Sequence, residues 1–439
     1  MVKMFAWLCS IVAASVATAQ TYQHPPEEIR RILDAPAPAD ALVSPSGEMV
    51  LLATPVRYRP ISDLAEPMIR GAGTRINPKN NASHLFPYYV ALELHHLPGG
   101  RVTPIQLPAN ARVTNVRWSS RGSMFAFANV TATSVEPWVV DVATGASRRI
   151  EGVRLNSALG FPLEWLPDEK TLLVKTVPTE RGDPPAEDLV PAGPRAEESA
   201  GVKRASSTYE TVDVLKSPHD QNLFEYYGTS QVALVSTTDS AMHPIGAPGV
   251  IWKLRPSPDG KYLLVERFER PYSSSRMIDR FPTLVEVWDM AGRKVETIAS
   301  LPLAEQVPIE GVRVGPRAYE WRATAPATVT WVEALDEGDT YKKVPHHDRV
   351  MMKPVGAAPT ELMRLQHRFD RLHWIERGDL ALVAEEDAET RTRKTWLLNA
   401  TDRGVAPRLV WSVGLDDAYH DPGEPVFARC RAARARFGS

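Results

Sequence analysis

Acyl transfer needs an activated nucleophile, such as a serine. A Gly-x-Ser-x-Gly stretch would place the serine on a strained strand-to-helix turn that exposes its hydroxyl for nucleophilic attack. The nearest match is Gly145-Ala146-Ser147-Arg148-Arg149, which ends in arginine where the motif needs glycine. The sequence therefore predicts no catalytic residue of this kind.

Two histidine motifs could supply metal ligands. His95 and His96 are neighbours in an expected strand, where successive side chains point to opposite faces, so they do not easily chelate one ion. His346-His347-Asp348 lies near an expected turn, but no third ligand is in view and a solvated loop is the simpler interpretation. We therefore predict no metal site and no cofactor.

Runs of acidic residues are the next candidates. Glu197-Glu198 and Glu385-Glu386-Asp387 are most simply solvated carboxylates.

Two arginine-rich phrases have a second interpretation. The side chains of Arg267, Arg270 and residues 276–280 could attract acidic peptides, although surface salt bridges are the simpler role. A substrate-binding residue cannot be assigned from these phrases alone.

The composition is that of a globular protein with many turns. Of 439 residues, 43% are hydrophobic and 24% are charged, and the formal net charge is -2. This balance gives no electrostatic argument for nucleic acid or for an anionic membrane, so we expect small molecules, peptides or proteins as partners. The 38 prolines suit short strands joined by turns better than long helices.

A repeated sequence element indicates the framework of the fold. Each copy has an aromatic or apolar residue, a short polar turn and then an apolar run, which is typical of a β-hairpin. The copies are ALVSPSGEMVLLATP from 41, NVRWSSRGSMFAFANV from 115, LEWLPDEKTLLVKTVP from 163, KLRPSPDGKYLLVERF from 253, YEWRATAPATVTWVEAL from 319 and LHWIERGDLALVAEED from 372.

A second hairpin phrase follows each copy, with glycine at most of its turns. Two hairpins make the four strands of one propeller blade, and the longer spacings between copies require loop insertions. We therefore predict an all-β fold, a β-propeller of six to seven four-stranded blades over residues 41–425. Tryptophans at one position before the turn are predicted to pack between blades and not to bind a ligand. They are Trp118, Trp165, Trp321 and Trp374.

Residues 179–208 interrupt the repeats. They are rich in Pro, Glu, Asp and Ala, lack hydrophobic periodicity and are predicted to form an exposed insertion in the third blade. The chain then regains order, because Ser217-Pro218 is a typical helix start and Leu223, Phe224 and Tyr227 are expected to share one helical face.

The N-terminus predicts export. Lys3 precedes an apolar stretch at residues 4–14, and Ala17-Thr18-Ala19 forms a small-x-small cleavage site, so residues 1–19 match a signal peptide. A buried helix or a membrane anchor is the alternative, but the stretch is shorter than the ~20 residues of a membrane span. We expect a secreted or periplasmic protein without a membrane span after cleavage.

Cleavage would also remove one of the two cysteines. Cys9 lies in the predicted signal peptide and only Cys430 would remain, so no internal disulfide is expected.

Residues 20–40 form a predicted N-terminal extension. Pro26 can open a short helix there, and Ile29, Ile32 and Leu33 form an apolar stripe that needs a packing partner.

The phrases YQHPPEEIRRILDAP, SPSGEMVLLATP, RINPKNN and LKSPHDQNLFEYYGTSQVALV together carry a family resemblance. Over residues 20 to about 425 the chain resembles the N-terminal half of prolyl-oligopeptidase-family serine peptidases, in the branch similar to glutamyl endopeptidases. The resemblance implies a propeller that caps a C-terminal α/β-hydrolase domain with a Ser, Asp and His triad. None of these catalytic residues has a counterpart here, and residues 426–439 form an atypical Arg-rich tail.

Three functions follow from these expectations. The first is the substrate-gating propeller of a secreted or periplasmic serine peptidase that acts on peptides, truncated before its catalytic domain and inactive alone. Its partners would be peptides or the missing hydrolase domain, with no role for nucleic acid. The second is a stand-alone propeller that binds or scaffolds other molecules in the periplasm. The third is a hydrolase with its site inside the propeller.

Overall fold

A computed structural model describes residues 24–423, apart from residues 85, 98, 188–211, 309, 376–378, 403, 418 and 421. The predicted signal peptide, the Arg-rich tail, Glu197-Glu198 and most of the 179–208 insertion lie outside the described residues. The chain divides after Ala37 into an N-terminal unit and the unit that holds the predicted propeller.

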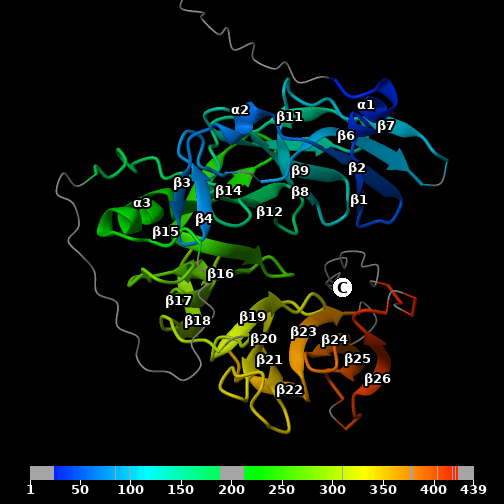
Figure 1. Ribbon diagram of the computed structural model, residues 1–439, viewed down its shortest axis with the longest axis vertical. Helices are drawn as coiled ribbons and strands as arrows, with labels where there is room; N and C mark the ends of the chain where they lie inside the picture. The colour runs from blue at the N-terminus through cyan, green and yellow to red at the C-terminus, as the bar shows by residue number, and fades with distance from the viewer. Residues whose placement is uncertain are drawn as a thin grey trace, which may run out of the picture. The chain divides into compact units, whose positions relative to one another are not determined.

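Within the described residues, six four-stranded antiparallel blades follow one another, each built from two successive hairpins (Figure 1). The fold is thus an all-β propeller, as predicted. Blades 1 and 2 comprise β1 (Asp40–Val43), β2 (Met49–Pro55), β6 (Tyr89–His96), β7 (Val102–Pro104), β8 (Val113–Trp118), β9 (Met124–Val130), β10 (Val135–Asp141) and β11 (Ser147–Arg149). Blades 3 and 4 comprise β12 (Leu163–Trp165), β13 (Thr171–Thr176), β14 (Thr229–Ser236), β15 (Met242–Pro256), β16 (Tyr262–Phe268), β17 (Thr283–Asp289) and β18 (Lys294–Leu301). Blades 5 and 6 comprise β19 (Pro316–Trp321), β20 (Thr328–Ala334), β21 (Asp348–Pro354), β22 (Thr360–Leu365), β23 (Arg368–Trp374), β24 (Leu380–Asp387), β25 (Thr392–Asn399) and β26 (Arg408–Gly414).

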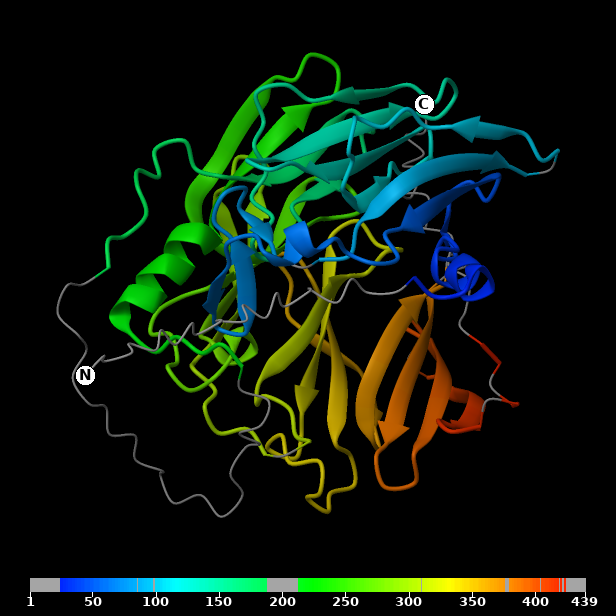
Figure 2. The same cartoon turned by 45° about the horizontal axis from the view of Figure 1, so that its top comes forward.

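Two connections join neighbouring blades through the backbone. Strand β15 is long enough to belong to two blades. Its first part pairs with β14 in blade 3, and its second part pairs with β16 in blade 4. Blades 1 and 2 share a single pairing, Tyr89 with Val113. Blades 5 and 6 are separate four-stranded sheets, drawn in yellow and orange in Figure 2.

The recurring polar turn has a physical explanation in the blade 4 copy. The Ser257 hydroxyl accepts a hydrogen bond from the Tyr262 amide at 3.0 Å and donates one to the Asp259 carboxylate at 2.6 Å. Gly260 adopts a φ of 69°, a left-handed conformation that glycine reaches without steric cost. The turn residues therefore close the hairpin and set its register.

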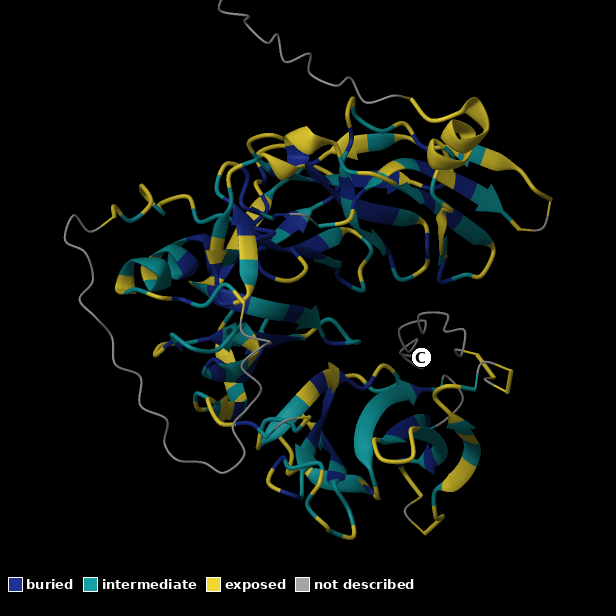
Figure 3. Cartoon of the chain, viewed as in Figure 1, coloured by how far each residue is buried: buried dark blue, intermediate teal, exposed yellow. Residues whose placement is uncertain are grey.

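Apolar side chains form the cores between successive blades (Figure 3). The tryptophans before the turns belong to these cores and are buried, as predicted. Three of them also bind the preceding blade, because their indole N–H groups donate to backbone carbonyls of its first strand. The pairs are Trp118 with Leu42, Trp165 with Arg117 and Trp321 with Arg255.

Elements outside the blades include a small sheet and a long helix. Strands β3 (Ile69–Gly71), β4 (Thr74–Asn77) and β5 (Ala82–Ser83) form a three-stranded sheet, and short helical segments lie at α2 (Ile61–Leu64) and η1 (Ile278–Arg280). Helix α3 (Pro218–Gly228) begins as predicted: Ser217 caps it, and Ser217 and Asp220 form a reciprocal capping box.

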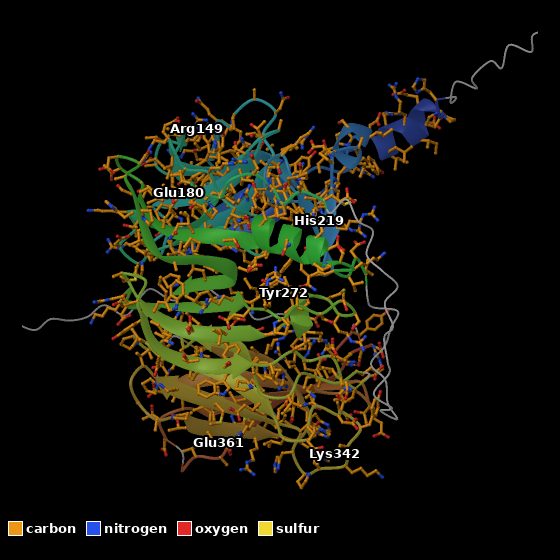
Figure 4. All side chains as sticks on the ribbon, turned by 90° about the vertical axis from the view of Figure 1, so that its left-hand side faces the viewer. Arg149, Glu180, His219, Tyr272, Lys342 and Glu361 are labelled. Carbon is orange, nitrogen blue, oxygen red and sulfur yellow. The ribbon has the colours of Figure 1, made fainter. Side chains whose placement is uncertain are left out.

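Helix α3 is anchored by aromatic residues. Phe224 packs edge-on against Tyr272 and Phe281, with ring centroids 5.1 and 5.6 Å apart. Tyr272 lies beside α3 in Figure 4, where His219 marks the first turn of the helix. The predicted apolar face of this helix is therefore confirmed.

The N-terminal unit contains α1 (Glu27–Leu33), which starts after Pro26 as predicted. The side chains of Ile29, Ile32 and Leu33 are exposed. Among the described residues, no helix is both long and apolar enough to cross a membrane.

Candidate functional site

A hollow of about 870 Å³ opens on the first strands of the early blades. We call it the inner hollow. Residues from β1, β8 and β15 line it, together with the loop before β12 and residues of the β3–β5 sheet. Those used below are Asp40, Arg75, Tyr89, Asn115, Arg117, Leu159, Gly160, Phe161 and Trp252.

Strand β8 bulges at this hollow. Its pairing with β9 shifts register between Thr114 and Arg117, and Asn115 takes a φ of 55°. A bulge of this kind leaves a residue without a ladder partner and turns the neighbouring side chains. Residues 114–117 therefore line the hollow at an irregular part of the strand.

An aromatic surface lies beside the bulge. Phe161 is 60% exposed, although it is a large apolar residue, and the Arg117 guanidinium lies 4.3 Å from the centre of its ring. Arg117 also pairs with Glu164 at 3.1 Å. The ion pair with Glu164 thus holds the guanidinium over the Phe161 ring, and the ring keeps an exposed apolar surface.

The charges of the inner hollow are largely balanced. Arg75 pairs with Asp213 at 2.9 Å, just as Arg117 pairs with Glu164. Asp40 accepts a hydrogen bond from the Tyr89 hydroxyl at 2.9 Å, and burial together with this bond raises the pKa of Tyr89 to about 12. The hollow therefore has no excess positive charge that would select an acidic side chain.

A buried amide network fixes the wall of this region. Asn81 adopts a φ of 63° and donates to Asn156 at 2.6 Å and to the Tyr227 carbonyl at the end of α3 at 3.1 Å. Arg181 donates to Asn81 at 2.6 Å, and its guanidinium lies 4.2 Å from the Tyr226 ring centre. The RINPKNN and EYYGTS phrases of the sequence thus meet in space.

The arginine-rich phrases form ion pairs and hydrogen bonds. Arg270 binds Glu225 on α3 at 2.6 Å and also Gln221 and Asn222, while Arg267 pairs with Glu286. These arginines do not line the inner hollow, and the salt-bridge interpretation is confirmed for both.

The solvated-loop interpretation of His346-His347-Asp348 is wrong. Asp348 is fully buried at the start of β21 and pairs with Arg317 and Arg368, because two blades enclose the carboxylate where β21 meets β23. His347 contacts Asp336 at 2.6 Å. These contacts form an ion-pair network, and no group of three or more potential metal ligands occurs within the described ranges.

The other short motifs also have defined positions. Glu385 is buried and accepts hydrogen bonds from the Trp396 indole and the His367 amide, so its assignment as a solvated carboxylate is wrong. The cause is its inward position on β24. His95 and His96 end strand β6 as expected, and His96 binds Thr103 and Arg101.

Sequence reasoning missed the residues that shape the inner hollow. Phe161 follows Gly160 in a loop without periodicity, and Arg117 resembles any polar residue of an alternating strand. Repeated phrases located the strands, but the exposed aromatic residue belongs to no repeat.

Comparison with known proteins identifies the relatives of the chain. Two curated proteins named "Probable glutamyl endopeptidase, chloroplastic", from Arabidopsis thaliana and from Oryza sativa subsp. japonica, are 36% and 35% identical over 430 residues, covering 94% and 93% of this chain. The chain is homologous to glutamyl endopeptidases. It spans 44% and 45% of the length of these two relatives. No family model matches the chain.

Solved structures with detectable similarity include an acylaminoacyl peptidase and the β-propeller domain of a protease. The acylaminoacyl peptidase of Pyrococcus horikoshii matches with a TM-score of 0.46 and 13% identity, over 85% of this chain and 46% of that chain. The β-propeller domain of the Trilobed protease from Pyrococcus furiosus matches with a TM-score of 0.40 and 10% identity, over 71% of this chain and 73% of that chain.

Proposed function

We propose that this chain is the propeller part of an exported serine peptidase and that its inner hollow admits and positions peptide substrates. The observation that carries this proposal is the identity to glutamyl endopeptidases along nearly all of the chain. The catalytic Ser, Asp and His belong, in this proposal, to an α/β-hydrolase domain outside this sequence.

The dimensions and lining of the inner hollow support a gating role. Its 870 Å³ lies within the usual range of about 300–1,000 Å³ for ligand sites. An extended peptide segment fits such a volume, whereas a folded domain does not. The exposed Phe161 ring offers apolar contact, and the bulge at Asn115 lines the hollow.

The proposed export rests on residues 1–19. Sequencing the N-terminus of protein recovered from the periplasm or the medium tests it, with a start at or near Gln20 as the expected result. An intact Met1 on that protein would contradict cleavage of a signal peptide.

Peptide binding tests the gating role directly. Fluorescent peptides of about ten residues are titrated into the purified chain and followed by anisotropy. The Phe161→Ala variant is expected to bind at least about fivefold more weakly, because it removes the exposed ring that a peptide contacts. Val295→Ala on β18 is the matched control, since Val295 is also an exposed apolar side chain but does not line the hollow. Equal affinities in both variants would refute the proposed site.

The hydrolase partner has a separate test. Reading the gene beyond codon 439 in all frames should reveal Gly-x-Ser-x-Gly followed by Asp and His. An unrelated neighbouring gene would favour the stand-alone binding protein. The purified chain is expected to cleave no peptide, and turnover abolished by a serine-directed phosphonate would instead place a hydrolytic site in the propeller.

A further inference from the structure

Lys175 on β13 is a fully buried lysine, and among the described residues its ammonium group contacts backbone carbonyls and no carboxylate. Its side chain is 1% exposed. The ammonium group donates to the backbone carbonyls of Leu159, of Ile251 at 3.2 Å and of Trp252 at 3.4 Å. A buried charge without a counter-ion is costly, so these carbonyl contacts are needed to offset its desolvation.

The three carbonyls come from two segments of the wall of the inner hollow. Leu159 belongs to the loop that ends at Phe161, whereas Ile251 and Trp252 belong to β15. Gly160 makes the approach of the two segments possible, because a Cβ atom there would collide with the Trp252 carbonyl. Lys175 thus joins the loop that carries Phe161 to the strand that carries Trp252.

The charged groups on the elements packed around Lys175 do not pair with its ammonium group. Glu164 on β12 pairs with Arg117, and Lys253 on β15 pairs with Glu266. Strand β14 contributes no charged residue, and Arg154 precedes the loop. Desolvation by burial is the only cause that lowers the pKa of Lys175, to about 7.

We propose that Lys175 is a positioning residue of the inner hollow: its ammonium group holds the loop at residues 156–161 against β15 and so places Phe161 and Trp252 for peptide contact. The inference rests on the proposed function for its peptide, but the contact between loop and strand can be tested without one.

The proposal gives a pH dependence with a defined sign. Burial lowers the pKa of Lys175 to about 7 while the loop is closed. Loop opening or unfolding returns the lysine to water, where it keeps its proton up to about pH 10, so both states bind more protons between these two pH values. The free energy of loop opening and the free energy of unfolding therefore both rise as the pH rises from about 7 to about 10, and the neutral amine still has two N–H groups that donate to the carbonyls.

Hydrogen exchange measured by mass spectrometry tests the contact. Wild type, Lys175→Met and the exposed control Lys170→Met are compared at pH 6 and pH 9, with rates normalised to intrinsic exchange. At pH 6, Lys175→Met is expected to exchange at least about fivefold faster than wild type over residues 156–162, with no change in the control. At pH 9 this ratio is expected to be larger, because opening the wild-type loop then costs more free energy. Equal exchange of Lys175→Met and wild type over residues 156–162 at both pH values would overturn the proposal.

Two further measurements test the contact between loop and strand if Lys175→Met does not fold. In wild type alone, protection over residues 156–162 should rise from pH 6 to pH 9, because an open loop would return the lysine to water. Gly160→Ala, which pushes the same loop from β15, should expose the loop at pH 6. Constant protection in wild type would overturn the proposal.

Peptide titrations separate this inference from the proposed function. Wild type should bind the peptide more tightly than Lys175→Met at both pH values. If wild type binds no peptide at either pH while the exchange results hold, the proposed function fails and the role of Lys175 in fixing the wall stands. Equal affinity in the two proteins would contradict the positioning role.

Discussion

Replacing Trp165 and Trp374 separately by phenylalanine isolates the contribution of one hydrogen bond between blades. The two residues occupy equivalent positions before the turns of blades 3 and 6, and their exposed fractions are 6% and 9%. The Trp165 indole N–H donates to the Arg117 carbonyl at 2.9 Å, whereas the Trp374 indole N–H is buried and has no hydrogen-bond partner among the described residues. Both substitutions therefore remove the same ring volume, but only Trp165→Phe also removes a hydrogen bond.

The expected difference follows from these contacts. Trp165→Phe loses a hydrogen bond with a net value of about 1 kcal/mol and leaves a carbonyl without that donor. Trp374→Phe removes an unpaired buried donor, which offsets part of the packing loss. It also weakens the contact with Arg322, whose guanidinium lies 4.4 Å from the Trp374 ring centre, by about 0.5 kcal/mol. We expect Trp165→Phe to destabilise the protein by about 1–2 kcal/mol more than Trp374→Phe.

Equilibrium urea unfolding of the two variants, followed by far-ultraviolet circular dichroism, measures this difference. Comparable slopes against urea concentration are required, because a changed slope reports a change in the surface exposed on unfolding. Equal losses, or a greater loss in Trp374→Phe, would refute the interpretation that the indole hydrogen bonds stabilise the contacts between blades.

Three further outcomes are expected. Asn81→Ala should destabilise the protein by about 2–4 kcal/mol and speed proteolysis near α3. Alanine is strained at a φ of 63°, and the hydrogen bonds to Asn156 and Tyr227 are lost. Unchanged stability would contradict the role of this hydrogen-bond network. Tyr89, with a pKa raised to about 12, should stabilise the fold below pH 10, and this contribution should be lost as the pH rises from 10 to 12. In an absorbance titration at 295 nm, Tyr89→Phe should lack one tyrosine that ionises late in wild type. If the missing tyrosine instead has an ordinary pKa, the raised pKa of Tyr89 is contradicted. Arg270→Ala should leave affinity for acidic peptides unchanged, since Glu225 already pairs with the arginine; anisotropy showing weaker binding would restore its role in recognition.

The blade architecture could be predicted because it repeats. Each blade encodes its own turn and apolar strands, as the Ser257 turn illustrates, so local sequence suffices to locate the hairpins. Helix α3 was predictable for the same reason, since its cap and first turn lie within four residues.

The inner hollow could not be predicted, because its residues depend on contacts between distant segments. Lys175 lies within an apolar strand, and only the folded chain brings the Leu159 and Trp252 carbonyls to its ammonium group. The burial of Asp348 and Glu385 was missed for a similar reason. Their sequence neighbours are charged, but their counter-ions and hydrogen-bond donors come from other strands.

Photo-crosslinking from the inner hollow tests the central claim most directly. A benzophenone amino acid replaces Phe161 in one sample and the exposed Val295 in another, and each protein is irradiated with a peptide of about ten residues. The proposal predicts adducts at position 161 that an excess of unlabelled peptide suppresses, with none above background at position 295. Equal labelling at both positions, or labelling at 295 alone, would contradict a peptide-admitting hollow.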